Sequence, residues 1–237
     1  MSNLEKYLKS IGRQEEVKEE EITVIRNPNL EKICRSYEKW LERDDQYWQG
    51  SYDHALKTFS RKKYTAKDIE EFSLELKKYE QRRYFEKTGL FLSALINSSK
   101  DKEFTILTEH LDKRINLIGY CNKKIVNVKG NAGDIVGWWN EGTISVEGNS
   151  GNSVGFCNEG TISVKGDAGD YVGSGNEGTI SVEGDAGNNV GSGNKGTISV
   201  EGKIKLLSKE ANYYRTSKIY EKGKLIVNEG RITKCQI

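Results

Sequence analysis

The sequence is poor in the residues that most often signal a catalytic or metal site. Its 237 residues include two histidines, one methionine and one proline. His54 and His110 have no partner at the spacing of a metal site or an acid–base pair, so we expect no catalytic, cofactor-binding or metal-binding residues. The cysteines form no CxxC pair, and two that share a repeat position, Cys121 and Cys157, would lie ~10 Å apart, beyond disulfide reach. Reduced, structural thiols are expected at Cys34, Cys121, Cys157 and Cys235.

Long apolar runs are also missing. No segment approaches the ~20 apolar residues of a transmembrane helix, and the N-terminal MSNLEKYLKSIG lacks the apolar stretch of a secretory signal. We therefore expect a cytoplasmic protein that does not contact membranes. Residues 118–202 carry 5 basic and 10 acidic side chains, and residues 203–237 carry 9 basic and 3 acidic ones. The acidic segment is a poor match for phosphates and the basic end is typical of a solvated surface, so a nucleic-acid partner is not expected.

A repeat of 18 residues fills the middle of the chain, from about residue 118 to residue 202. This segment holds 20 of the 25 glycines. A short fixed period is the signature of a solenoid, in which each repeat buries its apolar face against its neighbours. We predict an α+β protein with a helical domain over residues 1–103 and a β-solenoid over residues 104–237. Its regular coils would span residues 118–202, and a degenerate capping coil would span residues 203–237.

Side chains alternate across the repeated TISV segments, which predicts an inside and an outside for each coil. Ile144, Ile162, Ile180 and Ile198 would stack inward beside the following valines, opposite the valines at 136, 154, 172 and 190. Thr143, Ser145 and their equivalents would face solvent. Stacked asparagines at one corner would form a ladder of amide hydrogen bonds that satisfies backbone groups of the turn. The members of this structural ladder are Asn140, Asn158, Asn176 and Asn194.

The flanking segments carry signals of their own. The sequence Asn27-Pro28-Asn29 predicts a helix start, and a second helix is expected from Thr65, capped by that hydroxyl together with Asp68. Gly89 is expected to break the chain before the apolar segment 90–96, and FTILT from Phe104 to Thr108 looks like a strand. The acidic run 15–21 is interpreted as a solvated arm or the end of a helix. The segment 228–233 repeats the corner-plus-strand pattern and predicts a degenerate terminal coil.

Four copies of the pattern GxxGxxxG begin at Gly130, Gly148, Gly166 and Gly184, each followed by a G-x-I-x-V strand. This repeat resembles the GXGXG domain, which is found at the C-terminal end of the large chain of glutamate synthase and in a subunit of formylmethanofuran dehydrogenase. The resemblance implies a right-handed parallel β-helix that braces catalytic domains or subunits and binds no substrate. The chain departs from the family in carrying asparagine at the ladder positions. It also lacks an N-terminal cysteine nucleophile and an iron–sulfur cysteine cluster.

Aromatic residues gather at one end of the repeat. Tyr120, Trp138 and Phe156 share one position of the coil, Trp139 follows Trp138, and the next two coils have Ser174 and Ser192 there. Large apolar residues at one end of a regular surface indicate that something covers them. The cover could be the chain's own helical domain, through Leu90–Ile96, or a protein partner that docks on this patch.

Other sites are not favoured by the repeat. Calcium-binding nonapeptide rolls need an aspartate where this chain has Ile180, and the outward Thr and Ser rows, a possible binding plane, are bordered by charges. We expect a non-catalytic structural scaffold or protein-interaction module with a protein partner, without cofactor or small ligand. The alternative is an accessory, non-catalytic subunit of an oxidoreductase complex of the glutamate synthase or formylmethanofuran dehydrogenase kind. A third class is a surface-binding module that uses the Thr and Ser rows.

Overall fold

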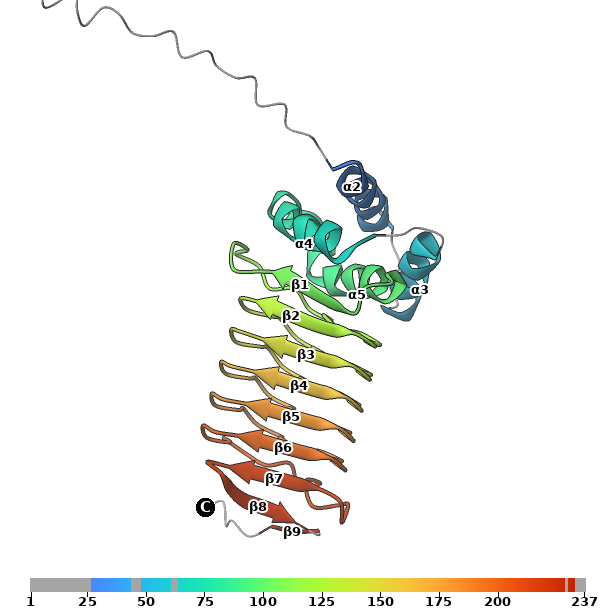
Figure 1. Ribbon diagram of the computed structural model, residues 1–237. Coiled ribbons are helices and arrows are strands. Elements are labelled where there is room, and N and C mark those ends of the chain that lie inside the picture. Colours follow the sequence, from blue (N-terminus) through green and yellow to red (C-terminus); the bar gives the residue numbers. More distant parts are fainter. Residues whose placement is uncertain (1–26, 44–47, 61–63, 229, 233–237) are drawn as a thin grey trace, which may run out of the picture.

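The computed structural model describes residues 27–43, 48–60, 64–228 and 230–232. The chain forms a group of helices seated on one end of a parallel β-solenoid of about seven turns (Figure 1). This confirms the predicted α+β class, with N-terminal helices followed by coils of about 18 residues. The acidic run 15–21 and Cys235 lie outside the described residues.

Four α-helices make up most of the described head. The predicted start of the first is confirmed, because the Asn27 side chain caps it and Pro28 opens it. The capping box of Thr65 and Asp68 is confirmed as well. A helix at 48–59 was not predicted from the sequence. The α-helices are α2 (Pro28–Leu41), α3 (Trp48–Phe59), α4 (Ala66–Glu75) and α5 (Thr88–Ser98), and the 3-10 turns are η1 (Leu76–Tyr79) and η2 (Phe85–Lys87).

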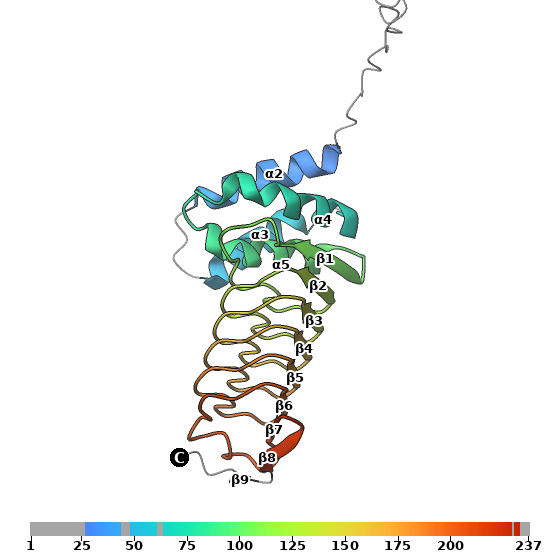
Figure 2. The ribbon, with the colours of Figure 1, turned by 90° about the vertical axis from the view of Figure 1, so that its left-hand side faces the viewer.

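Helix α5 closes the N-terminal end of the solenoid (Figure 2). The predicted break at Gly89 is wrong, because this glycine lies inside the helix. A Cβ atom there would sit 2.1 Å from the carbonyl oxygen of Asn116, so glycine is what allows the helix to lie against the first coil. The Ser93 hydroxyl accepts hydrogen bonds from the N–H groups of Gly119 and Tyr120 at 3.0 and 3.1 Å. The helix therefore both buries the apolar end and satisfies its backbone donors.

Seven strands stack in parallel and in sequence order along the solenoid (Figure 1). From β2 to β6 the strands start every 18 residues, and from β3 to β6 identical residues pair, as Ile144 does with Ile162. The predicted strand at FTILT is confirmed as β1, the first of the stack. The strands are β1 (Glu103–Leu107), β2 (Ile125–Lys129), β3 (Thr143–Val146), β4 (Thr161–Val164), β5 (Thr179–Val182), β6 (Thr197–Val200) and β7 (Lys218–Glu221).

The predicted inside and outside of the coils are confirmed. The inward isoleucines at 144, 162, 180 and 198 and the valines two residues after each are fully buried. Val136, Val154, Val172 and Val190 are fully buried on the opposite wall. The threonines that start strands β3, β4 and β5 are exposed. Each coil thus contributes a thin apolar layer that is covered only by the layers before and after it.

The C-terminal end closes by a reversal of direction and not by a further coil. Strand β8 (Lys224–Asn228) pairs antiparallel with β7, and β9 (Arg231–Ile232) pairs antiparallel with β8. The physical reason is the turn between β7 and β8, where Lys222 and Gly223 both have positive φ, 51° and 70°. Two such residues make the tight hairpin turn whose twist matches antiparallel strands. The prediction of a degenerate coil at 228–233 is therefore corrected to a hairpin with a very short edge strand.

A column of buried asparagines runs along one corner of the solenoid. The Nδ2 atom of Asn140 donates to the Oδ1 atom of Asn158 at 2.8 Å, and each Nδ2 also donates to the carbonyl oxygen two residues ahead, as Asn158 does to Gly160 at 3.0 Å. The side chains are buried, so these bonds satisfy turn carbonyls that water cannot reach. The column begins at Asn122, continues through Asn140, Asn158, Asn176 and Asn194, and ends on the Ser217 hydroxyl.

Two further columns, on the outer surface, were not foreseen from the sequence. In one of them the Oδ1 atom of Asp134 accepts from the N–H of Asn152 at 2.7 Å, and the Oδ1 atom of Asn152 accepts from the N–H of Asp170 at 2.9 Å. Hydrogen bonds from Asn188 hold the pKa of Asp170 below its usual value. Because these positions need only an acceptor oxygen, Asn and Asp interchange along them. The second column contains Asn131, Asn149, Asp167 and Asp185.

We predict that Ile162→Asp abolishes the cooperative unfolding transition of the solenoid or lowers its free energy of unfolding by more than about 4 kcal/mol. The carboxylate would enter a thin layer of apolar side chains, where it would be an unpaired charge. Thr161→Asp, one residue away and exposed, should change the free energy by less than about 1 kcal/mol. Urea unfolding followed by circular dichroism measures both. Equal stability of the two variants would contradict the inward position of Ile162.

We predict that Asn158→Asp lowers the free energy of unfolding by about 2–4 kcal/mol at pH 7, because two donated hydrogen bonds become repulsive contacts between acceptors. The new carboxyl should have a raised pKa in the folded state, so its penalty relative to wild type should be smallest below about pH 4 and grow as the pH rises.

The matched control for this variant is Asn152→Asp, which keeps the acceptor oxygen used by Asp170. It should stay within about 1 kcal/mol of wild type at pH 7. Urea titrations of the wild type and both variants, at pH 7 and below about pH 4, provide the comparison. If Asn152→Asp lowered the free energy of unfolding as much as Asn158→Asp does, the buried amide donors would not be the cause of the loss of stability.

Candidate functional site

Four of the residues singled out in the sequence meet on one face of the first coils. The ring centroids of Tyr120 and Trp138 lie 5.4 Å apart, and those of Trp138 and Phe156 lie 5.6 Å apart, both in edge-to-face geometry. Trp139 packs at 4.9 Å from Trp138. Trp48 of α3, which the sequence did not single out, joins them at 5.4 Å from Trp138. We call Trp48, Ile135, Trp138, Trp139 and Phe156 the aromatic patch.

The head covers only the upper end of this aromatic column. Tyr120 is buried under α3, where its hydroxyl hydrogen-bonds to Gln49 and its ring lies 5.0 Å from that of Tyr52. Burial raises the pKa of Tyr120 above its ordinary value, so the phenol stays protonated. The segment Leu90–Ile96 contacts the Tyr120 backbone through Ser93. The cover therefore comes from α3, because this helix crosses the side of the first coil while α5 lies on its end.

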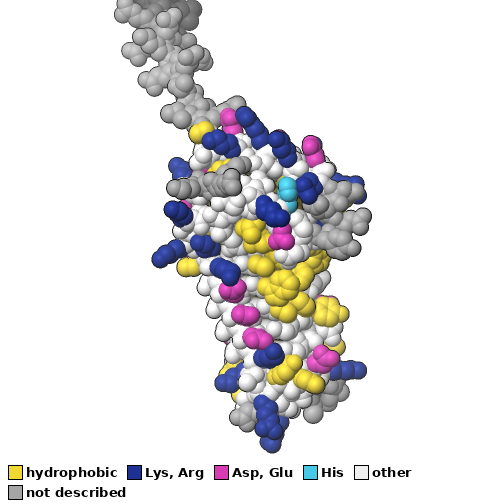
Figure 3. Space-filling view, turned by 90° about the vertical axis from the view of Figure 1, so that its right-hand side faces the viewer, with side chains coloured by type: hydrophobic (Ala, Val, Ile, Leu, Met, Phe, Trp, Pro, Cys, Tyr) yellow, Lys and Arg dark blue, Asp and Glu magenta, His cyan; other side chains and the backbone are white. Residues whose placement is uncertain are grey.

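The rest of the patch faces solvent. Trp139 is 44% exposed, Phe156 38% and Trp48 37%. With Ile135 and Ser153, the rings of Trp48, Trp138 and Phe156 line a hollow of about 200 Å³. Figure 3 shows apolar side chains gathered beneath the head on the first coils. Within the described part of the chain, the buried Nε1 atom of Trp138 has no hydrogen-bond partner. The solenoid thus presents an open hollow with aromatic walls, a surface of the kind that binds partners.

The backbone under the patch is held in a conformation that is unfavourable for residues other than glycine. Ile135 and Trp139 have positive φ, 62° and 55°, although a β-branched residue seldom adopts this region. Hydrogen bonds from their N–H groups to the next coil, at 2.7 and 3.1 Å, hold them there. The same conformation recurs in each regular coil, since Leu117, Ser153, Tyr171 and Asn189 also have positive φ. The aromatic side chains therefore project from a rigid support.

Acidic side chains border the patch on both sides. One border is the row Glu141, Glu159 and Glu177, two residues beyond the turn that carries Trp139. Lys123 pairs with Glu141 at 3.0 Å and Lys195 with Glu177 at 2.6 Å, and these contacts raise the pKa of both lysines. Asp134 and Asp170, next to Ile135 and Tyr171, form the other border. Two of the three glutamates are thus paired with lysines, and Glu159, Asp134 and Asp170 are the acidic side chains of these borders without an ion pair among the described residues.

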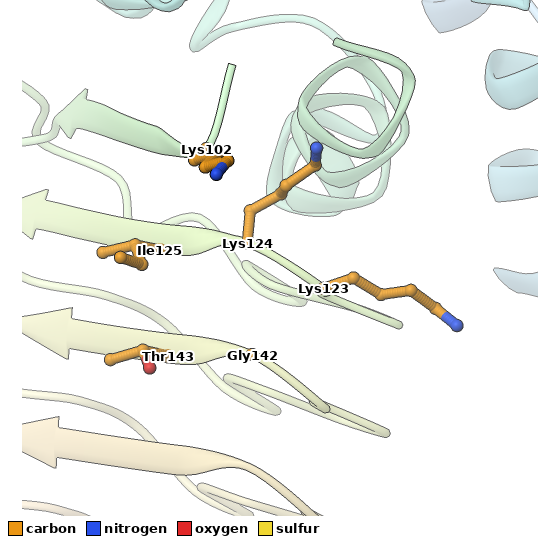
Figure 4. Close-up of a pocket in the computed structure, with 6 residues that line it drawn as sticks. All are labelled: Lys102, Lys123, Lys124, Ile125, Gly142 and Thr143. Carbon is orange, nitrogen blue, oxygen red and sulfur yellow. The ribbon is translucent and has the colours of Figure 1, made fainter. Parts of the chain in front are cut away.

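A second hollow, of about 480 Å³, lies beside β2 and is lined by three lysines (Figure 4). The ammonium of Lys124 donates to the carbonyl oxygen of Ser99 at 3.2 Å, and Lys123 pairs with Glu141. Two of the three ammonium groups are therefore already engaged by the protein at this open surface. Lys124 thus joins the first coils to the end of α5, and Lys123 joins two neighbouring coils.

The described residues contain no cluster of three or more His, Cys, Asp or Glu side chains that could hold a metal ion. Burial raises the pKa of the thiols of Cys34, Cys121 and Cys157, which keeps them protonated and weakly nucleophilic. The described helices include none that is both long and apolar enough to cross a bilayer.

No known protein family, curated protein or solved structure matches this chain. The resemblance to the GXGXG domain therefore rests on the repeat alone. The glycines of that repeat have a local explanation in the packing of the coils. Gly137 has φ 70°, and a Cβ atom there would lie 2.4 Å from the Cδ1 atom of Ile162. At Gly133 it would lie 2.1 Å from the Asn116 side chain. A tight 18-residue coil demands these glycines whatever its ancestry.

We predict that Tyr120→Ala lowers the free energy of unfolding by about 3–5 kcal/mol, because it empties a buried site between α3 and the first coil. Phe156→Ala, at the same position two coils later, should cost no more than about 1 kcal/mol, since this residue is 38% exposed and its removal opens no closed cavity. Urea unfolding monitored by tryptophan fluorescence and by circular dichroism gives both values. Similar losses for the two variants would mean that Phe156 is also a structural residue.

Proposed function

We propose that this protein is a non-catalytic scaffold that binds another protein through the aromatic patch. The observation that carries the proposal is the exposure of Trp139 and Phe156 on a rigid surface whose first aromatic residue the head already covers. Trp and Phe side chains in a preformed hollow are typical anchors of protein interfaces.

The solenoid itself does not require these aromatic rings. The next two coils carry Ser174 and Ser192 at the position of Phe156, with the same strand register and the same corner asparagines. A polar residue is therefore compatible with this place in the coil. Large apolar side chains kept at an exposed position where serine fits support a role in binding.

The rest of the molecule is suited to act as a rigid support for the aromatic patch. Backbone hydrogen bonds join every coil to the next, and both ends of the stack are closed, by α5 and by the β7–β8 hairpin. Such a body holds a binding surface in one shape and lowers the entropy lost when a partner docks. The alternative role, an accessory subunit of an oxidoreductase complex, has the four GxxGxxxG copies in its favour.

We test the proposal by placing a photo-crosslinking amino acid at position 139 and producing the protein in its source organism. A single adduct is expected at this position and none at position 163, which lies on the sheet face of β4. The captured protein is then purified and its affinity measured by calorimetry. Trp139→Ser and Phe156→Ser should each weaken binding about tenfold or more, because anchors at an interface contribute over 1 kcal/mol.

The control is Ser163→Ala, which should bind as wild type does. Identical adducts at positions 139 and 163, or affinities insensitive to the patch variants, would contradict the proposal. Metal analysis of the purified complex decides between the two roles. Iron, molybdenum or tungsten in stoichiometric amount would favour the oxidoreductase role.

A further inference from the structure

The apolar surface extends beyond the aromatic patch along the same face of the solenoid. Tyr171, 48% exposed, occupies the position of Ile135 two coils later, and Leu206 is 45% exposed near the C-terminal end. These two residues line a second apolar hollow, of about 290 Å³. We call the surface that runs from Trp138 past Tyr171 to Leu206 the strip. It crosses about four coils, or ~19 Å at the spacing of β-strands. Its length suits a short segment of chain better than a broad, flat interface.

Beside the hollow of Trp138 and Phe156 the borders carry more acidic than basic side chains, whereas Lys209 and Glu210 both line the second hollow and Lys205 helps to lower the pKa of Asp170. On one side Glu141 and Glu177 are paired by Lys123 and Lys195, while Glu159 between them has no ion pair with any described residue. On the other side each of Asp134 and Asp170 uses one carboxylate oxygen for the next coil. An acidic segment in the strip would be repelled by both rows, and a neutral segment would gain no attraction from them. A segment with cationic side chains around an apolar anchor would pair with them.

We propose that the occupant of the strip is a cationic segment of a partner protein, in which Lys or Arg side chains flank one or two large apolar residues. The inference rests on the proposed function and names the chemistry of the partner at the same site. The apolar residue would enter the hollow beside Trp138 and Phe156, and the cations would reach Glu159 and the aspartate row. The acidic borders supply selectivity and the aromatic patch supplies the contact area.

A second copy of this chain is the competing occupant. Its C-terminal end exposes Tyr213 and Tyr214 beside Arg215, which is also cationic and aromatic. That cluster lies near the Leu206 end of the strip, so its docking in the hollow beside Trp138 of another copy would join two different surfaces. Such a contact does not close on itself and would build open chains.

The test uses three fluorescent ten-residue peptides that share two apolar anchors, one Trp and one Leu. The other eight positions are all Lys, all Ser or all Glu. Binding to the full-length protein is followed by fluorescence anisotropy at low and at physiological salt. The Lys peptide should bind about tenfold more tightly than the Ser peptide, and the Glu peptide most weakly. The advantage of the Lys peptide should shrink as salt is added.

Variants separate the two contributions. Glu159→Gln combined with Asp134→Asn should remove most of the preference for the Lys peptide, and the asparagine keeps the acceptor oxygen that Asn152 needs. Trp139→Ser combined with Phe156→Ser should weaken all three peptides. The matched control is Glu147→Gln combined with Glu183→Gln, which removes as many charges just beyond the C-terminal ends of β3 and β5. This control should leave the preference unchanged.

Three outcomes would overturn the inference. Patch-dependent binding without preference for the Lys peptide would remove the charge argument and leave the proposed function standing. Binding of the Lys peptide that ignores the patch variants, or falls equally in the control, would show unspecific attraction to acidic side chains. Concentration-dependent self-association in sedimentation velocity, lost in both Trp139→Ser and Tyr213→Ser, would show that a second copy is the occupant.

Discussion

Each coil can bury its apolar layer only against the coils before and after it, and this stacking requires an apolar residue at the same position of each coil. The in-register pairing of the strands and the buried asparagine column are two consequences of that constraint. At the corner a carbonyl group such as that of Gly142 accepts one hydrogen bond from a backbone N–H of the next coil. The asparagine amide adds a second donor to this buried carbonyl group and at the same time joins neighbouring coils. Everything that the protein presents outward rests on this regular interior.

A stack of this kind has two open ends, and the chain closes them in different ways. At the N-terminal end Gly89 lets a helix lie directly on the first coil, and Ser93 satisfies the donors that another coil would have paired. At the C-terminal end a hairpin turns the chain back and leaves an edge strand of two residues. The head also reaches over the side of the stack through α3. It is the limited reach of α3 that leaves part of the aromatic column open.

The glycine repeat shows how a motif can reflect geometry. Gly133 and Gly137 are required because neighbouring coils approach within the space of a methyl group. In this chain the spacing therefore has a reason in the packing of the coils, and it indicates the architecture more strongly than it indicates a family. The outer Asn and Asp columns follow the same logic, because the repeat there preserves an acceptor oxygen and not a charge. By contrast, the aromatic residues break the repeat, which is why they point to a role outside the coil.

The sequence alone predicted the solenoid and its period. It also predicted the inward isoleucines and valines and the two helix starts at Asn27 and Thr65. These features depend on neighbouring residues or on a strict period, and both are visible in a linear chain. The helix at 48–59, the place of Gly89 inside α5 and the antiparallel end were decided only in the tertiary structure. So was the division of the aromatic column into a buried Tyr120 and an exposed Phe156. The physical reason is that these features depend on contacts between α3, α5 and the coils. Such contacts join residues far apart in the chain and leave no periodic trace in it.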